Sequence, residues 1–405
     1  MANQSWAWLT MFAVAVSFNS ASTAFAQDSD GDGVADSSDN CPQIANANQA
    51  DCDGDGTGNV CEIAGGATDE NCNGIPDRCE QSWGDFDLSG AVSGDDLGYL
   101  LSAWGTGDRM GDLDENGLIN GADLAYVLLR WGPTPFPPRQ PLQWAETLAC
   151  HPDPAVVTDV ALFNAIVGVG LPWRVRDHAS NIEMVLIPPG TFVMGCSQGS
   201  TEFACYVHEQ PVHQVMLTSP FYLGRTEVTQ AEWEAEMASN PSAFRGTDDS
   251  PLRPVEQVTW SMTQDFLFQN SLRLPTEAEW EFACRAGTTT AFYNGSNDDA
   301  TLANLGWYVG NNDPYGTKPV ATKSPNALGI FDTLGNVSEW VNDWWESYPS
   351  STPVTNPHGP VTGTHRVLRG GGWYGSSSDN RVSNRNATYP AIAFFTIGFR
   401  VARTP

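Results

Sequence analysis

Residues 275–283 read PTEAEWEFA and carry the clearest helix signal in the chain. Thr276 suits the N-cap position, and Glu279, three residues on, is the partner that completes a capping box. On this helix we expect Trp280 and residues 282–284 to be buried under glycine-rich coil. Outward from it, between about Asn181 and Arg403, the sequence has short strand-like runs, many Gly, Asn and Trp residues, and few long helical patterns.

Motifs in this region occur in an order that resembles the sulfatase-modifying factor family, whose best-known members are formylglycine-generating enzymes. They are MVLIPPGTFVMG (184–195), EQPVHQV (209–215), EVT (227–229), RLPTEAEWE (273–281), GNVSEW (335–340) and GFR (398–400). The resemblance covers residues 181–403, over half of the chain. It implies an α+β fold that is irregular, related to C-type lectins and low in regular secondary structure.

The resemblance also implies a chemistry that this chain lacks. Active members oxidise a substrate cysteine to formylglycine with copper and oxygen, using two cysteines that follow an Arg-Gly-Gly-Ser stretch. Here the serine position falls on Gly372 and the two cysteine positions fall on Gly375 and Asn380. Because Cu(I) prefers thiolates and the last cysteine is Cys284, we expect no copper site and no copper-dependent activity. A reused binding scaffold is the favoured interpretation, and an enzyme that modifies sulfatases or other proteins is the alternative.

If the domain binds, the segment that replaces the copper positions is the expected ligand surface. Its aromatic and short polar side chains suit a peptide or a glycan. The alternative is that Trp373 and Tyr374 belong to the core. The candidate ligand-surface residues are Trp373, Tyr374, Ser376, Asn380 and Arg381.

Calcium is expected in this domain, because the resemblance carries over two structural sites with oxygen ligands. The first comprises the side chains of Asn304 and Asp313 with the carbonyls of Leu305 and Tyr315. The second comprises the side chains of Asp332 and Glu339 with the carbonyls of Gly335 and Val337. An iron site is disfavoured, since His208, Glu209 and His213 match the ordinary strand entry of the family.

Near the N-terminus, five acidic loops share one twelve-residue ligand spacing of EF-hand type, each with glycine at position 6. We expect calcium in all five. Positions 1, 3, 5, 7, 9 and 12 are Asp28, Asp30, Asp32, Val34, Asp36, Asp39; Asp51, Asp53, Asp55, Thr57, Asn59, Glu62; Asp69, Asn71, Asn73, Ile75, Asp77, Glu80; Asp85, Asp87, Ser89, Ala91, Ser93, Asp96; and Asp112, Asp114, Asn116, Leu118, Asn120, Asp123.

Loops one to three (27–80) resemble thrombospondin type 3 repeats, on the stretches DNCP (39–42) and DCDGDG (51–56). Loops four and five (81–132) each lead into a Leu/Trp helical segment and resemble a dockerin, a module that docks onto a cohesin domain of another protein. A partner protein, within an extracellular polysaccharide-degrading complex, is one interpretation. The other is an intramolecular stabilising module in which the two helices pair their Leu/Trp stripes.

The remaining segments concern export and linkage. Residues 1–26 are interpreted as a signal peptide, 133–141 as a proline-rich linker, and 142–180 as a helical connector with a helix that starts at Asp153-Pro154. We expect a secreted, periplasmic or cell-surface protein with no transmembrane segment after signal cleavage. The net charge of −29 argues against nucleic-acid binding.

Nine cysteines make disulfides possible in an exported chain. The sequence suggests Cys52 with Cys61, Cys72 with Cys79, and Cys196 with Cys205, while Cys41, Cys150 and Cys284 have no obvious mates. Connectivity itself cannot be deduced from one sequence.

Overall fold

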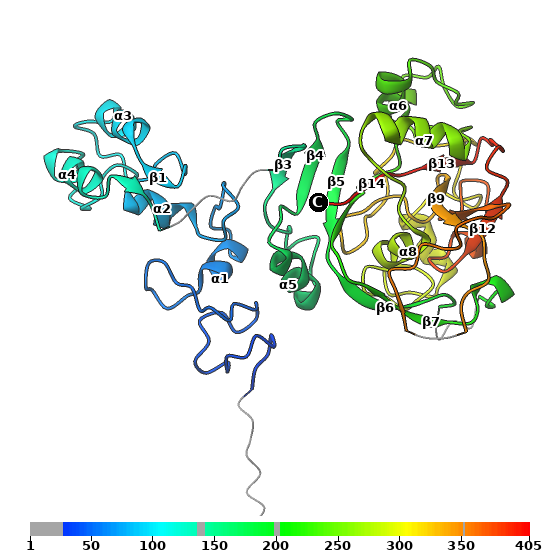
Figure 1. The fold of residues 1–405 in the computed structure, drawn as a ribbon, viewed down its shortest axis with the longest axis horizontal. Coiled ribbons are helices and arrows are strands. Elements are labelled where there is room, and N and C mark those ends of the chain that lie inside the picture. Colours follow the sequence, from blue (N-terminus) through cyan, green and yellow to red (C-terminus); the bar gives the residue numbers. More distant parts are fainter. Residues whose placement is uncertain (1–26, 136–141, 198–202, 351–352) are drawn as a thin grey trace, which may run out of the picture.

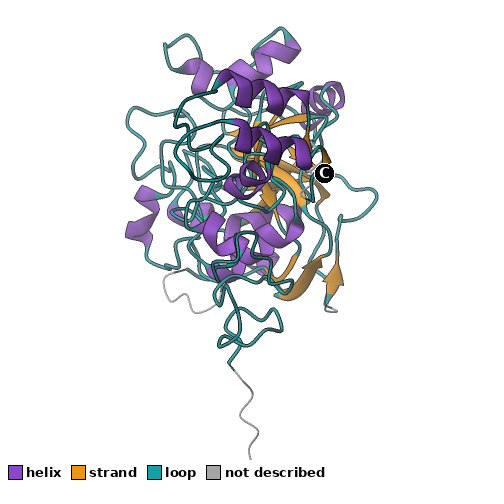
Figure 2. Cartoon of the chain, turned by 90° about the vertical axis from the view of Figure 1, so that its left-hand side faces the viewer, coloured by secondary structure: helices purple, strands orange, loops and turns teal. Residues whose placement is uncertain are grey.

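The computed structural model describes residues 27–135, 142–197, 203–350 and 353–405. The predicted signal peptide and most of the predicted linker therefore lie outside the described residues. The C-terminal domain mixes helices and strands, and Figure 2 shows that loops make up much of the chain. The expected irregular α+β fold is thus confirmed.

Three sheets form the frame of the C-terminal domain (Figure 1). The five-stranded sheet, in the order β14-β8-β5-β4-β3, consists of Ala402–Arg403, Phe221–Gly224, Glu183–Ile187, Arg174–Asp177 and Ala145–Ala149. The four-stranded sheet, β12-β11-β9-β13, consists of Arg385–Thr388, Arg366–Arg369, Ser338–Trp344 and Ile397–Phe399. The three-stranded sheet, β10-β7-β6, consists of Val354–Thr355, His213–Leu217 and Gly190–Met194.

Helix α8 (Glu277–Arg285) contacts β6, β9 and β11, so it links two of the sheets. Its N-terminus has the predicted capping box, with Thr276 and Glu279 satisfying each other's backbone N–H groups. Trp280 is buried against Leu334 and Val341. Two further helices, α6 (Gln230–Met237) and α7 (Trp260–Gln269), bury Trp233 and Phe266, which stack 5.5 Å apart.

The predicted helical connector is only partly helical. Strands β3 and β4 belong to the five-stranded sheet, so the domain begins well before residue 181. Helix α5 (Val160–Val169) starts at Asp159, whose side chain accepts a hydrogen bond from Leu162 N. The start predicted at Asp153-Pro154 is wrong, because there the Asp153 carbonyl accepts from Val156 and Val157 in a turn that does not continue as helix.

The N-terminal region has short elements between its loops: α1 (Asn59–Ala64), α2 (Asp77–Trp83), α3 (Gly94–Ser102), α4 (Gly121–Leu129) and a two-stranded sheet of β1 (Ala91–Val92) and β2 (Gly132–Pro133). Leu100 and Val127 are fully buried in a small core with Phe86 and Ile119. Helices α3 and α4 contact each other through part of their Leu/Trp stripes, whereas Leu101, Trp104, Leu128 and Trp131 are each about half exposed.

Four disulfides connect the described residues: Cys41–Cys61, Cys52–Cys79, Cys72–Cys150 and Cys196–Cys205. Only the predicted Cys196–Cys205 bond is confirmed. The suggested pairs within single loops, Cys52 with Cys61 and Cys72 with Cys79, are wrong. Cys41–Cys61 and Cys52–Cys79 instead tie successive calcium-type loops together, and Cys72–Cys150 ties the third loop to the segment after β3, in a region with few apolar residues to hold it. Cys284 is free and buried.

No helix in the described ranges combines the length and apolar character needed to cross a bilayer.

Candidate functional site

The positions assigned to the copper cysteines lie side by side in the loop that follows β11. A β-carbon built on Gly375 would lie 3.2 Å from Nδ2 of Asn380. Asn380 is fully buried, its Nδ2 donates to the carbonyl of Ser376 at 2.6 Å, and its Oδ1 has no partner. The two positions are therefore adjacent in space, but they hold a glycine and a buried amide in place of thiols.

Cys284 does not replace the absent thiols. It lies in the interior on α8, where burial raises the pKa of its thiol to about 12. A thiol held protonated in this way is a poor metal ligand, because the thiolate is the coordinating form. The donors present around Gly375 and Asn380 thus do not fit Cu(I).

Aromatic rings from four chain segments gather around the same loop. The ring of Trp373 lies 5.3 Å from Phe244, 6.2 Å from Tyr315, 5.5 Å from Tyr374 and 5.7 Å from Phe395. Trp373 itself is buried, whereas Tyr315 and Tyr374 are 69% and 66% exposed and Phe395 is 42% exposed. We call these five residues the Trp373 surface.

Hydrogen bonds hold the backbone of this surface in place. Trp373 N donates to the carbonyl of Asn336, and the indole N–H of Trp373 donates to the carbonyl of Phe395 at 3.2 Å. Val309 N donates to the carbonyl of Gly375 at 3.0 Å, which fixes the loop that carries Tyr315. The exposed rings are therefore presented by an ordered backbone around a buried tryptophan.

The structure corrects part of the expected ligand surface. Of the candidate residues, Tyr374 and Ser376 are exposed, but Trp373, Asn380 and Arg381 are buried. Arg381 turns inward because its guanidinium pairs with both carboxylate oxygens of Glu209, at 2.6 and 3.0 Å. Phe244, Tyr315 and Phe395 were missed, since no local motif marks residues that come together from distant segments.

The pairing of Glu209 also bears on the iron alternative. Both Glu209 oxygens accept hydrogen bonds from Arg381, and His213 is directed to the carbonyl of Pro211 through Nδ1. His208 and His213 thus flank a carboxylate that is already neutralised by a buried arginine. With both oxygens bound by Arg381, the Glu209 carboxylate serves a buried ion pair.

The second expected calcium site fits a hard cation in one respect. Asp332 is fully buried, its Oδ2 accepts from Ala321 N at 2.7 Å, and its Oδ1 has no partner among the described residues. Burial raises the pKa of Asp332 to about 6. Glu339, by contrast, is already engaged by Arg400 and the Trp280 indole. The orphaned carboxylate oxygen is what a calcium ion would satisfy.

The first expected calcium site fits less well. The side chains of Asn304, Asp313 and Tyr315 are exposed, and the Leu305 carbonyl accepts from the hydroxyl of Tyr293 at 3.0 Å. The Lys318 ammonium donates to the carbonyls of Pro314 and Gly316, beside Asp313. A cation next to Asp313 opposes the approach of a second one.

The N-terminal loops repeat one backbone geometry five times. In each, the carboxylate at position 1 accepts N–H groups from the turn ahead of it, including that of the position-6 glycine. The φ angles of Gly33, Gly56, Gly74, Gly90 and Gly117 are +94°, +94°, +83°, +82° and +88°. Glycine adopts this left-handed conformation without steric cost, so its recurrence at position 6 is explained.

Carboxylate oxygens converge in four of these loops. The groups are Asp28, Asp30, Asp32; Asp51, Asp53, Asp55; Asp85, Asp87, Asp96; and Asp112, Asp114, Asp123. The third loop differs, because Asn71 and Asn73 donate to Glu80, and Asp69 lies 2.7 Å from Nε2 of His151. Oxygen-only groups of this kind suit a hard divalent cation.

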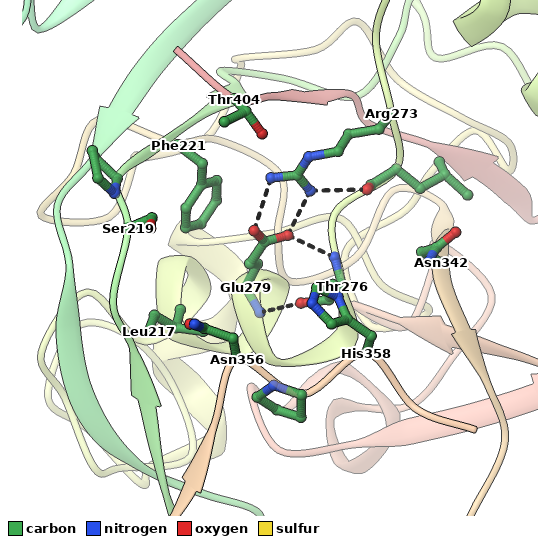
Figure 3. A pocket seen from close by; sticks show the side chains of 13 residues that line it. Leu217, Ser219, Phe221, Arg273, Thr276, Glu279, Asn342, Asn356, His358 and Thr404 are labelled. Atoms are coloured by element: carbon green, nitrogen blue, oxygen red, sulfur yellow. Dashed lines mark hydrogen bonds and ion pairs between the residues drawn. The ribbon is translucent and has the colours of Figure 1, made fainter. Parts of the chain in front are cut away.

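A separate cavity of about 370 Å³ opens at the N-terminus of α8 (Figure 3). Inside it, Arg273 forms a two-pronged ion pair with Glu279, at 2.6 and 2.8 Å, and Glu279 also accepts from Thr276 N. His358 and Asn356 reach in from the segment after β10. The charges drawn there are paired with each other, so this cavity offers a ligand no free charge.

Comparisons with known proteins agree with these features. Residues 174–405 match the Sulfatase-modifying factor enzyme 1-like domain, and residues 26–49 match the Thrombospondin type 3 repeat. The formylglycine-generating enzyme of Streptomyces coelicolor is 30% identical over 54% of this chain and 88% of its own length. The solved structure of Treponema denticola variable protein 1 is 30% identical, with a TM-score of 0.50, over 55% of this chain and 95% of that chain.

A further relative is named serine/threonine-protein kinase pkn1, from Chlamydia caviae, and is 32% identical over 55% of this chain. The match covers 38% of that relative, so the chain spans less than half of its length.

Proposed function

The chain belongs to the Sulfatase-modifying factor enzyme 1-like domain family, and from this premise we propose that its C-terminal domain binds a ligand at the Trp373 surface and does not oxidise cysteine with copper. Fold and catalytic chemistry are separable, because function depends on the residues of a site and not on the scaffold that carries them. Gly375 and Asn380 stand where the family chemistry needs thiolates.

The observation that carries the binding proposal is the exposure of Tyr315, Tyr374 and Phe395 around the buried ring of Trp373. Rigid aromatic faces supply contact area at low entropic cost, and they stack on peptide groups or sugar rings. Ser376 and Asp379 add polar groups at the edge of the cluster, since both lie in the turn that follows Gly375. The expected ligand is a short peptide or a glycan.

Peptide and glycan arrays probed with the full chain test this proposal. A ligand found there should bind at least tenfold more weakly to the Tyr315→Ala and Tyr374→Ala variants. Phe268, which is 88% exposed on α7, provides the matched control as Phe268→Ala. If all three variants bind the ligand equally well, the ligand does not bind at the Trp373 surface.

The enzymatic alternative has a direct test of its own. The full chain is incubated with copper, oxygen and a cysteine-containing sulfatase peptide, and the peptide mass is followed. Conversion to formylglycine would show that catalysis survives without the cysteine pair, and the scaffold proposal would then fail.

For the N-terminal region we propose calcium-stabilised modules of an exported protein. The match to the Thrombospondin type 3 repeat, the converging carboxylates and the disulfides support this, since disulfides persist in oxidising compartments. The half-exposed Leu101, Trp104, Leu128 and Trp131 favour a protein partner for loops four and five. Pull-down with the full chain, with and without chelator, tests calcium-dependent docking, and its absence would favour the intramolecular role.

A further inference from the structure

A second cavity, of about 300 Å³, lies beneath the segment that follows β10 and shares no lining residue with the Trp373 surface. Its walls come from the N-terminus of α8, the end of β9 and residues 354–359. Pro357 and His358 line both this cavity and the one drawn in Figure 3, so the two openings adjoin.

Asp343, at the end of β9, is the unusual group in this cavity. Its side chain is part of a residue only 5% exposed, and its Oδ2 accepts from Glu277 N at 2.9 Å. Within the described part of the chain, no Lys or Arg nitrogen lies within 4 Å of its carboxylate. A buried carboxylate without a counter-ion is costly, and natural structures keep few of them.

The other charges around the cavity do not neutralise Asp343. The Glu277 carboxylate forms ion pairs with Arg385 at 2.6 Å and with Arg369 at 3.3 Å, so these two guanidinium groups already have a carboxylate partner. Glu346 stands exposed at the rim, and no ion pair of its carboxylate occurs among the described residues. Asp343 and Glu346 are thus the lining carboxylates without an ion pair among the described residues, and His213 and His358 also line the space.

Asp343 lines the cavity, and the hydrogen bond that its carboxylate accepts among the described residues goes to Oδ2, which leaves Oδ1 without one. Gly359 also lines it, and a β-carbon on Gly359 would lie 3.1 Å from Oδ1 of Asp343. A β-carbon there would also lie 3.3 Å from the backbone oxygen of Trp344, and the φ of +66° favours glycine, so glycine lets this segment pack closely against Asp343. Apolar walls from Met194, Val354 and Pro357 complete the space.

We propose that this cavity binds an alkylammonium group, such as a lysine side chain of a partner peptide or a free primary amine, with Asp343 as its counter-ion. A buried carboxylate without an ion pair lines a space that also has apolar walls, and an ammonium group on an alkyl chain complements both. Glu346 at the rim adds attraction for the cation as it enters.

The electrostatics of Asp343 support this assignment. Burial, together with the neighbouring Glu277 carboxylate, raises the pKa of Asp343 to about 7. An opposite charge at contact distance would favour the ionised form of this carboxylate and offset the effect of burial. A bound ammonium ion would supply that charge.

Titration calorimetry of the full chain with n-butylammonium, and with 1-butanol as the neutral isostere, tests the proposal. We expect one n-butylammonium per chain, bound at least tenfold more tightly than 1-butanol. Nα-acetyl-lysine N-methylamide separates the two sources: binding of this capped lysine indicates a peptide side chain, and binding of n-butylammonium alone indicates a free amine. Failure of both probes to bind would overturn the proposal.

Variants locate the site. Asp343→Asn keeps an acceptor for Glu277 N and should weaken n-butylammonium at least tenfold, while Asp265→Asn, at an exposed aspartate on α7, should leave it unchanged. Glu346→Gln changes only a rim residue and should weaken binding a few-fold, so it serves if Asp343→Asn does not fold. If both cavity variants bind n-butylammonium with the native affinity, the ammonium group does not bind at Asp343 and the proposal is wrong.

Discussion

Gly375 and Asn380 face each other across the loop after β11, with 3.2 Å between Nδ2 of Asn380 and the point where a β-carbon on residue 375 would stand. The two positions are thus immediate neighbours in space, although neither residue can bind a soft metal. The backbone of Gly375 is not in the left-handed region, but a β-carbon there would lie 3.1 Å from Cβ of Asp379, so a side chain at 375 needs its neighbours to shift by a few tenths of an ångström.

Restoring thiols at these two positions should create a Cu(I) site. We expect Gly375→Cys with Asn380→Cys to bind one Cu(I) at least 100-fold more tightly than the native chain, because two thiolates replace donors that copper disfavours. Competition with a chromophoric Cu(I) chelator measures this, and each single variant is a control. Tight stoichiometric uptake by the native chain would contradict the expected absence of copper.

The buried ion pair of Arg381 and Glu209 should be costly to break. Arg381→Met leaves a buried carboxylate unpaired, and we expect the free energy of unfolding to fall by about 3–5 kcal/mol. Arg176→Met removes an arginine whose partners are partly exposed, so the loss should stay below about 1 kcal/mol. Denaturant unfolding measures the free energy of unfolding of both variants. Similar decreases in the two variants would show that burial of the ion pair does not determine its contribution to stability.

How much the sequence predicts depends on how local each feature is. The capping box of α8 and the glycine in each calcium-type loop are encoded within a few residues, and both were predictable. The disulfides between loops and the rings of Phe244, Tyr315 and Phe395 depend on segments brought together by the fold. The sequence predicts Arg381 at the surface, because nothing near it reveals the buried partner Glu209, which lies 172 residues away.

A pH effect on stability should come from Glu256. Its side chain is buried, Oε1 accepts from Phe244 N, and Oε2 has no partner, so burial raises the pKa of Glu256 to about 7. A carboxyl whose pKa is raised by folding stabilises fully below its unfolded pKa of about 4.3, and this contribution is lost as pH rises through the folded pKa.

Between about pH 4.5 and pH 7.5, stability of the native chain should therefore fall by on the order of 2 kcal/mol more than that of Glu256→Gln. Parallel denaturant titrations across this range measure the difference. Asp265→Asn, at an exposed site, should reproduce the native profile. Identical slopes for native chain and Glu256→Gln would show that this carboxyl titrates normally.

The number of calcium ions bound per chain should depend on the aspartate at position 1 of each loop. Asp112→Ala removes the carboxylate that accepts Asn116 N and Gly117 N, and we expect one fewer bound Ca²⁺ per chain. Asp95→Ala changes an exposed residue outside the ligand positions and should bind the native number. Calorimetry on chelator-stripped protein counts the ions, and an unchanged count in Asp112→Ala would remove the fifth loop from the set.

The disulfide between Cys72 and Cys150 should contribute more than the one between Cys196 and Cys205. The first spans 78 residues and the second 9, so the chain-entropy estimate is about 4.5 kcal/mol against about 2.6 kcal/mol. The first also secures the third loop, where Asp69 meets His151. We expect Cys72→Ser with Cys150→Ser to speed proteolysis between residues 69 and 80 in saturating calcium, whereas Cys196→Ser with Cys205→Ser should leave that region protected. Equal protection in both double variants would mean that calcium alone holds the loop, because the ion would then have replaced the constraint of the covalent bond.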